Sequence, residues 1–295
     1  MPIYDKDGRR LFHAYDLTGN ELLKTYDKDG VEIQIGEVDY DNYSYTQYCK
    51  VTLGQMQGFD IYAGVIFQYR ANSSINNIMC TIDAENSSII QNNISCVSAH
   101  GDSASFSKEF YNENDEFPLI YVTADTTPTI YVNRVTETTS QLIRTYEFPI
   151  AKTGYSVSHA YDEDNKIMYM LGYTEQNYLS DNGGSNKTLV SLWDMDNLTD
   201  NGDGTFTPDF IRSYEIPFIY CMQGQQFKDG MIWTSSGYVN HAGYVYALKP
   251  DDGTILHTID LETTTEVEGI SFISDRDMVV GLQGGTYRKY TFATA

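Results

Sequence analysis

A three-residue pattern recurs along most of the chain: a small or apolar residue, a polar residue, and then Gly or Ala. Its copies are Met56-Gln57-Gly58, Ala99-His100-Gly101, Ser158-His159-Ala160, Met222-Gln223-Gly224 and Val267-Glu268-Gly269. The polar residues are separated by 43, 59, 64 and 45 residues. Four-stranded blades of β-propellers span roughly 40–50 residues, and longer ones carry loop insertions. The spacing therefore predicts a repeating all-β architecture with one copy in each unit.

The segments between these copies favour strands over helices. Runs such as GVIFQYR, TIYVNRV and DMVVGLQ are rich in β-branched and aromatic residues, and they end at Gly, Asn, Asp or Ser. No sustained apolar stripe of helical period is present, so almost no helix is expected. RTYEFP (144–149) and RSYEIP (212–217) resemble equivalent strands of successive units, each ended by a proline. DNGDGT (200–205) is typical of a hairpin tip and does not fit a calcium loop.

The two ends of the repeating region indicate how it closes. The last unit, 267–292, has room for only three strands, whereas an unassigned strand, TQYCKVTL (46–53), precedes the first copy. Pairing of these two ends would remove open sheet edges. We therefore expect an all-β fold in which residues 45–295 form a five-bladed β-propeller closed by an N-terminal strand. A large β-sandwich is the rival architecture.

The innermost strand of each propeller blade lines the central channel, so the polar residues of the pattern are expected to form an axial ring. They are Gln57, His100, His159, Gln223 and Glu268. The small residue that follows each one would let neighbouring backbones approach closely. Such a ring can hold ordered water, and its His and Glu side chains leave a divalent ion at the axis as an alternative. No other cofactor is expected.

Surface loops supply a second set of candidate site residues. A sugar needs a flat apolar face to stack on and hydrogen-bonding groups for its hydroxyls, which exposed aromatics beside amides provide. The candidate ligand-binding residues are Tyr173, Gln176, Tyr178, Asn182, Tyr238, Asn240 and His241. No catalytic residue is assigned, because P-loop, Rossmann and G-x-S-x-G patterns are absent.

Charge and cysteine usage exclude several classes of protein. Asp and Glu number 41 against 19 Lys and Arg, a net charge of −22, which opposes binding to nucleic acid or to anionic membranes. The cysteines form no CxxC pair, so we expect buried free thiols at Cys49, Cys80, Cys96 and Cys221. The chain shows no classical signal peptide and no apolar stretch of membrane-spanning length, so membrane insertion is not expected.

An eleven-residue sequence repeat occurs three times between Tyr4 and Gly36. Each copy opens with Tyr-Asp, at Tyr4, Tyr15 and Tyr26, and carries a glycine four positions later. Each joins a turn to a short apolar run, and such small β arms cannot hold a core alone. Residues 1–44 are therefore expected to be a β-turn repeat segment for attachment or oligomerisation, ordered against a partner or against copies of itself.

Two stretches resemble a known group of proteins. The N-terminal YDKDGRRLFHAYDLTGNELLKTYDKDG is similar to tandem repeats that open virion-associated proteins of phages and prophages of gut Firmicutes. The closing EVEGISFISDRDMVVGLQGGTYRKYTF resembles the last blade of phage tail-associated propellers. The resemblance implies a phage tail protein with a receptor-binding platform and an oligomeric assembly, such as a trimer, located in the virion or outside the cell. It implies no catalytic residues.

Three functional hypotheses follow from the sequence. The first is a host-attachment protein of the virion that recognises a host-surface glycan or teichoic acid through its propeller loops, with other tail proteins as partners. The second is a propeller hydrolase or lyase that uses His100, His159 and Glu268 as metal ligands or acid–base groups. The third is a purely structural spacer with no ligand. The sequence does not require an enzyme.

Overall fold

The computed structural model describes residues 38–72, 75–124, 127–176 and 184–294, together with four short strands before residue 38. The chain divides into two compact units, Met1–Tyr43 with Phe292–Ala295, and Ser44–Thr291. The first unit contains a sheet with the strand order β2-β1-β3-β4. Its strands are β1 (Ile3–Tyr4), β2 (Arg10–Leu11), β3 (Lys24–Tyr26) and β4 (Glu32–Gln34). The turns of the repeat, including residues 5–9 and 27–30, lie outside the described residues.

Three larger sheets have four strands each, and within each sheet the sequential strands pair antiparallel. The first is β6 (Met56–Tyr62), β7 (Val65–Asn72), β8 (Ile75–Asp83) and β9 (Ser88–Ser95). The second is β18 (Met222–Lys228), β19 (Met231–Ser236), β20 (Tyr244–Leu248) and β21 (Ile255–Asp260). The third is β22 (Val267–Phe272), β23 (Asp277–Leu282), β24 (Thr286–Thr294) and β5 (Val38–Lys50).

The remaining sheet has eight strands in two antiparallel halves. One half is β10 (Ser103–Phe106), β11 (Ile120–Ala124), β12 (Thr129–Val135) and β13 (Ser140–Glu147). The other is β14 (Tyr155–Asp162), β15 (Ile167–Tyr173), β16 (Thr188–Asp200) and β17 (Thr205–Ile216). A short parallel pairing of β13 with β17 joins the halves. α1 (Ile150–Thr153) is the only helix in the described part of the chain, which confirms the expected near-absence of helix.

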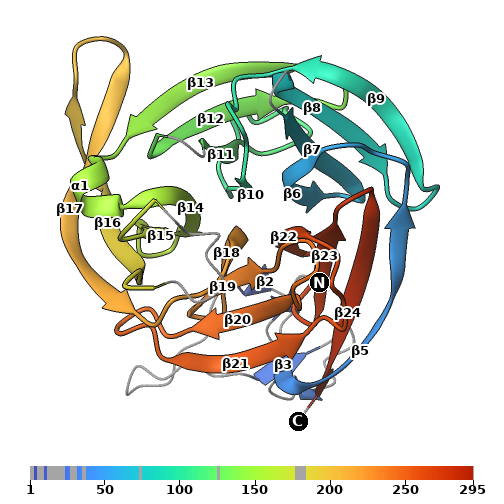
Figure 1. The fold of residues 1–295 in the computed structure, drawn as a ribbon. Helices are drawn as coiled ribbons and strands as arrows, with labels where there is room; N and C mark the ends of the chain where they lie inside the picture. Colours follow the sequence, from blue (N-terminus) through green and yellow to red (C-terminus); the bar gives the residue numbers. More distant parts are fainter. Residues whose placement is uncertain are drawn as a thin grey trace. The chain divides into compact units, whose positions relative to one another are not determined.

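The sheets surround a common centre (Figure 1), with β6, β10, β14, β18 and β22 innermost and β9, β13, β17 and β21 at the periphery. The innermost strands contact one another around this centre, β6 with β10 and β22, and β18 with β10, β14 and β22. Each sheet thus buries its faces against its neighbours and presents its first strand to the axis. The fold is all-β and β-propeller-like.

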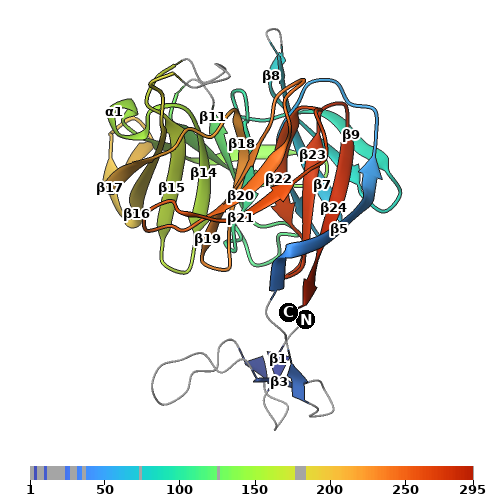
Figure 2. The same cartoon turned by 60° about the horizontal axis from the view of Figure 1, so that its bottom comes forward.

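The strand before the first copy of the pattern completes the last sheet. β5 lies next to β24 in the order β22-β23-β24-β5, and Figure 2 shows β23, β24 and β5 side by side. The backbone N–H groups of Val51 and Leu53 donate to the carbonyls of Gly285 and Gly284, at 2.9 and 3.5 Å. The predicted pairing of early and late strands is therefore confirmed.

Apolar cores lie between adjacent sheets. Between the two halves of the eight-stranded sheet, the fully buried Trp193 packs edge-on against Phe148, with ring centroids 5.1 Å apart. Between the second and third four-stranded sheets, Trp233 packs edge-on against Phe272 at 5.2 Å. All four cysteines are buried and outside disulfides, as the sequence predicted.

The two similar proline-ended segments occupy equivalent places. Each lies on the outermost strand of its half-sheet, β13 or β17, and these are the two strands that pair in parallel. In each, the arginine guanidinium stacks over the tyrosine two residues later, Arg144 over Tyr146 at 5.8 Å and Arg212 over Tyr214 at 5.5 Å. The predicted hairpin tip at residues 201–204 joins β16 to β17, and the Asp200 carboxylate accepts the Gly202 N–H at 2.8 Å.

Glycines let the innermost strands approach one another closely. A Cβ on Gly58 would lie 2.7 Å from the Gly101 carbonyl oxygen, and a Cβ on Gly224 would lie 2.5 Å from the Gly269 Cα. Gly224 also has a φ of +38°, a region that residues with side chains rarely adopt. The close backbone approach expected from the small residues of the pattern is confirmed at these positions.

Candidate functional site

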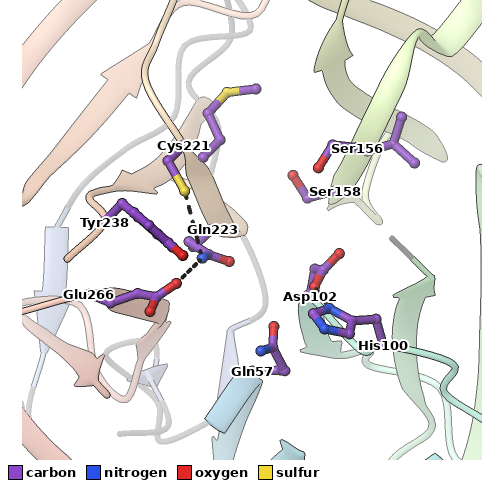
Figure 3. A pocket seen from close by; sticks show the side chains of 11 residues that line it. Gln57, His100, Asp102, Ser156, Ser158, Cys221, Gln223, Tyr238 and Glu266 are labelled. Atoms are coloured by element: carbon purple, nitrogen blue, oxygen red, sulfur yellow. Dashed lines mark hydrogen bonds and ion pairs between the residues drawn. The ribbon is translucent and has the colours of Figure 1, made fainter. Parts of the chain in front are cut away.

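A polar cavity of about 250 Å³ opens at the end of the axis where the innermost strands begin (Figure 3). We call it the acidic cavity. Its lining residues are Gln57, His100, Asp102, Ser156, Val157, Ser158, Cys221, Met222, Gln223, Tyr238 and Glu266. The volume is below the roughly 300–1,000 Å³ of sites for drug-sized ligands, so the cavity suits a small polar group.

One wall of the acidic cavity is a network of amides and glutamates. The Gln223 Nε2 donates to the Glu266 Oε1 at 3.4 Å, and the Gln283 Nε2 donates to the Glu268 Oε1 at 2.5 Å. Burial raises the pKa of Glu266, against a hydrogen bond from Gln283 and the nearby His100, which lower it. Glutamates whose pKa is raised beside a cavity are candidates for ligand or proton binding.

The opposite wall carries an imidazole–carboxylate pair. The His100 Nδ1 is hydrogen-bonded to the Asp102 Oδ1. The His100 side chain is 36% exposed and that of Asp102 only 13%, so the imidazole is the more accessible of the two. A carboxylate in this position fixes the orientation of an imidazole and favours its protonated form.

The structure brings only part of the predicted axial ring into this cavity. Gln57, His100 and Gln223 line it, whereas His159 and Glu268 do not. His159 is fully buried: its Nε2 is hydrogen-bonded to the Ser105 Oγ at 2.8 Å, and its Nδ1 to the Thr123 hydroxyl. Burial lowers its pKa to about 3, so the ring is neutral and both nitrogens are used inside the core.

Glu268 lies behind the acidic cavity. It is fully buried, and its Oε2 has no hydrogen-bond partner among the described residues. Its pKa is raised well above the usual range by burial and by the neighbouring charges of Glu266 and Asp102. Glu268 thus lies close to the carboxylates of the cavity without lining it, and its raised pKa favours the protonated, neutral form.

Neighbouring residues line the cavity where two members of the predicted ring do not. Ser156 and Ser158 line it in the place predicted for His159, and Glu266 lines it in the place predicted for Glu268. The register shifts in β14 and β22 do not account for this, because β6 has a similar shift across Gln57, which does line the cavity.

The predicted loop residues divide into several environments. Tyr173 is fully buried, and its hydroxyl donates to the Ile219 carbonyl at 3.1 Å, so it is not an exposed loop aromatic. Gln176 is exposed. Tyr178 and Asn182 lie outside the described residues.

The second predicted loop lies at the acidic cavity. Tyr238 is 36% exposed and lines the cavity. Asn240 is exposed in the same loop, with a φ of +68°. His241 faces a separate cavity, with its ring 4.6 Å from that of Tyr220. The fold therefore brings Tyr238 into the same cavity as three residues of the predicted ring. The sequence had placed the loop residues and the axial ring in different regions.

Sequence reasoning missed Asp102, Ser156, Ser158 and Glu266. Each lies two or three residues from a polar residue of the pattern or directly before one, on the same strand or the segment that leads into it. Asp102 had a local signal, because a carboxylate two residues after His100 can reach its imidazole. The other residues lie outside the polar position of the pattern, so the repeat gave no signal for them.

A second cavity, of about 520 Å³, lies where the innermost strands end. We call it the aromatic cavity because Tyr62, Phe106, Tyr161, Phe227 and Phe272 line it. The buried Asp60 also lines it. The Asp60 Oδ2 accepts the Phe106 N–H at 2.6 Å and its Oδ1 accepts the Ser271 hydroxyl at 2.5 Å. Burial raises the pKa of Asp60 to about 6 despite these bonds.

The described ranges contain neither a candidate metal centre nor a candidate membrane-spanning helix. Within them, no group of three or more His, Cys, Asp or Glu side chains is arranged to hold a metal ion. Across the same ranges, no helix has the length and apolar character needed to cross a bilayer.

No family model matches the chain, and no curated protein sequence matches it. Among solved structures, it is similar to the Myxococcus xanthus glutaminyl cyclase, with a TM-score of 0.51, 11% identity, and coverage of 88% of this chain and 97% of that one. At this identity the likeness concerns the fold alone.

Two further structures are more distant. A protein of unknown function from Bacteroides thetaiotaomicron VPI-5482 has a TM-score of 0.47 and 12% identity, covering 99% of this chain and 90% of that one. The WD40 beta propeller domain of Doa1 has a TM-score of 0.38 and 16% identity, covering 79% and 62%. The arrangement of the sheets around a common centre makes the chain a β-propeller-like protein, with an acidic cavity at one end of its axis.

Proposed function

We propose that this protein is a tail-associated binding protein of a phage or prophage, and that its acidic cavity recognises a host-surface ligand, a glycan or teichoic acid. The observation that carries the proposal is the composition of the cavity. The partly exposed ring of Tyr238 stands beside the amides of Gln57 and Gln223 and the carboxylate of Glu266. An aromatic face with converging amide and carboxylate groups is the combination that hydroxyl-rich ligands require.

The proposal includes the architecture that presents the cavity. The eight-stranded sheet would be two blades joined through β13 and β17, so that residues 45–295 form a five-bladed propeller. Residues 1–44 would attach this platform to other tail proteins or to further copies of the chain. Several weak cavities on one oligomer would then bind a repetitive host surface with high avidity.

The test uses the full-length chain on intact host cells and on purified cell-wall polymer. We expect binding to both, and a loss of about tenfold or more in a Gln57→Ala/Gln223→Ala variant, because two hydrogen-bonding amides are removed. Gln141, exposed on the outermost strand β13, provides the matched control as Gln141→Ala. No binding to either preparation, or equal binding by both variants, would contradict the proposal.

A hydrolase or lyase is the second candidate, favoured by one specific observation. Glu266, whose pKa is raised, faces the same cavity as the His100–Asp102 pair. A carboxyl group whose pKa is raised holds its proton more readily and can act as a general acid, and an imidazole can act as a base. Release of soluble fragments from cell-wall polymer by the native chain, abolished in Glu266→Gln, would favour this candidate. Intact polymer after prolonged incubation would remove it.

A further inference from the structure

The acidic cavity carries carboxylates without an opposing Lys or Arg. Asp102 and Glu266 line it, Glu268 lies directly behind, and its lining residues include no Lys or Arg. His100 is the one basic side chain of the lining, and it is already hydrogen-bonded to Asp102. A ligand group that enters this cavity therefore meets a negative potential.

A buried hydroxyl faces the same space. Ser158 is 2% exposed, lines the cavity, and its Oγ has no hydrogen-bond partner among the described residues. Figure 3 shows Ser158 directed into the open space opposite Cys221 and Gln223. A buried hydroxyl without a partner costs free energy, so a ligand that supplies a donor or acceptor there gains a bond without displacing another.

The glutamates are held in mutual repulsion. Burial raises the pKa of Glu268, and the charges of Glu266 and Asp102 raise it further. Gln283 is the shared neutral donor, hydrogen-bonded to Glu268 and close enough to lower the pKa of Glu266. A neutral ligand leaves this repulsion in place. A cationic ligand relieves it and stabilises the ionised carboxylates.

The side chains around the cavity indicate which kind of cation it would hold. No group of three or more acidic, His or Cys side chains in the described ranges is placed to hold a metal ion. An ammonium group makes fewer geometric demands, since it offers three donors that can point to separate acceptors. Glu266, Asp102 and the Ser158 Oγ provide such acceptors around one cavity.

We propose that the acidic cavity selects ligands that carry a primary ammonium group on a small hydroxyl-rich scaffold, that is, amino sugars over their neutral N-acetylated forms. The proposal rests on the proposed function, because it specifies the ligand of the same site. Acetylation removes the charge and adds bulk while the sugar ring is unchanged, so the two forms differ at the group that the carboxylates would contact.

The test is calorimetric titration of the full-length protein with glucosamine and with N-acetylglucosamine. Charge-assisted hydrogen bonds are worth roughly 1.5–3 kcal/mol, so glucosamine should bind about tenfold or more tightly. Glu266→Gln should weaken glucosamine binding by about tenfold and leave N-acetylglucosamine within about twofold. Glu215→Gln removes the same charge from an exposed site on β17 and should alter neither affinity.

Proton release distinguishes binding in the acidic cavity from nonspecific attraction of cationic glucosamine to a negatively charged protein. A bound ammonium group lowers the pKa of Glu266 and Glu268, so glucosamine should displace protons into the buffer. The displaced amount should fall in Glu266→Gln. Titrations in two buffers of different ionisation enthalpy measure it, and the same release in Glu215→Gln identifies the cavity as its source.

Ser158→Ala serves as a second variant in case Glu266→Gln impairs folding. Removal of an unpartnered hydroxyl should leave the melting temperature unchanged or raise it, and should weaken glucosamine binding severalfold. Equal affinity for both sugars, or binding of neither, overturns the ammonium inference. If the full-length chain shows either result but still binds host cells, the proposed function stands. If it also fails to bind host cells, the proposed function is overturned as well.

Discussion

The two ends of the innermost strands carry cavities of opposite character. At the start of these strands, the acidic cavity is small and lined by Gln, Ser, Asp and Glu side chains around one tyrosine. At their end, the aromatic cavity is larger and lined by five aromatic rings, with Lys108 and Lys228 among acidic neighbours. The same strands build both, so the difference arises from the residues at the strand ends. The layer between them, with His159, Ser103 and the close-packed glycines, separates the two.

The largest change in stability should come from adding a side chain to a glycine of that separating layer. Gly224→Ala places a Cβ 2.5 Å from the Gly269 Cα at a φ of +38°, so backbone must shift on two innermost strands. We expect a loss of about 3 kcal/mol or more in the free energy of unfolding. Gly230, with a φ of +71° and open space around its Cβ position, is the control, and Gly230→Ala should cost about 1–2 kcal/mol. Chemical denaturation measures both, and equal losses would contradict the steric explanation.

A second prediction concerns the histidine of that layer. His159→Leu leaves the Ser105 and Thr123 hydroxyls without their shared partner, at a cost of about 2–4 kcal/mol. The pKa of His159 falls to about 3 in the folded protein from 6.5, so its stabilising contribution is present above pH 6.5 and is lost as the pH falls toward 3. Unfolding measured across this window should show the loss in the native chain and a flatter profile in the variant. An unchanged profile would mean that another group titrates.

Asp60 should give the opposite slope at the aromatic end. Its pKa is raised from 3.8 to about 6, so its contribution to stability is present below pH 3.8 and is lost as the pH rises through 6. The change corresponds to about 2–3 kcal/mol. In Asp60→Asn this slope should vanish, at the cost of one acceptor for the Phe106 or Ile61 N–H. Unfolding at pH values on both sides of 6 tests it, and a slope that survives the substitution would assign it elsewhere.

The smallest predicted effect is on ligand binding, and it tests which of the two cavities holds the ligand. Tyr238→Ala removes the aromatic face of the acidic cavity and should weaken binding to cell-wall polymer about five- to tenfold, or about 1 kcal/mol. Tyr62→Ala removes a ring from the aromatic cavity and should leave this binding unchanged. Sedimentation of protein with insoluble polymer measures both. The reverse result would move the ligand site to the other end of the axis.

The repeating all-β architecture could be predicted because its physical cause is local. Gly58 and Gly224 lie where innermost strands nearly touch, and a residue with a side chain would not fit there. A small residue therefore recurs in the sequence once in each copy of the pattern. The pairing of β5 with β24 was also predictable, since an open edge at each end of a repeat needs a partner.

The composition of the acidic cavity was only partly predictable. Gln57 and Gln223 face it as expected, but His159 is buried in the core, and Ser156 and Ser158 face the cavity. Which side chains at a strand end face a cavity depends on tertiary packing and not on the residues of the strand alone. Tyr173 was misassigned to an exposed loop because an aromatic at the end of a strand can face either way.

The pairing of β5 with β24 also has a consequence during synthesis. β5 leaves the ribosome early, and its partner is translated only after more than two hundred further residues. A nascent chain that stops before residue 286 keeps one unpaired ladder at each end of its growing set of sheets. We therefore expect chains that lack β24 to be captured by chaperones or proteases, so that only chains in which β5 has found its partner accumulate as folded protein.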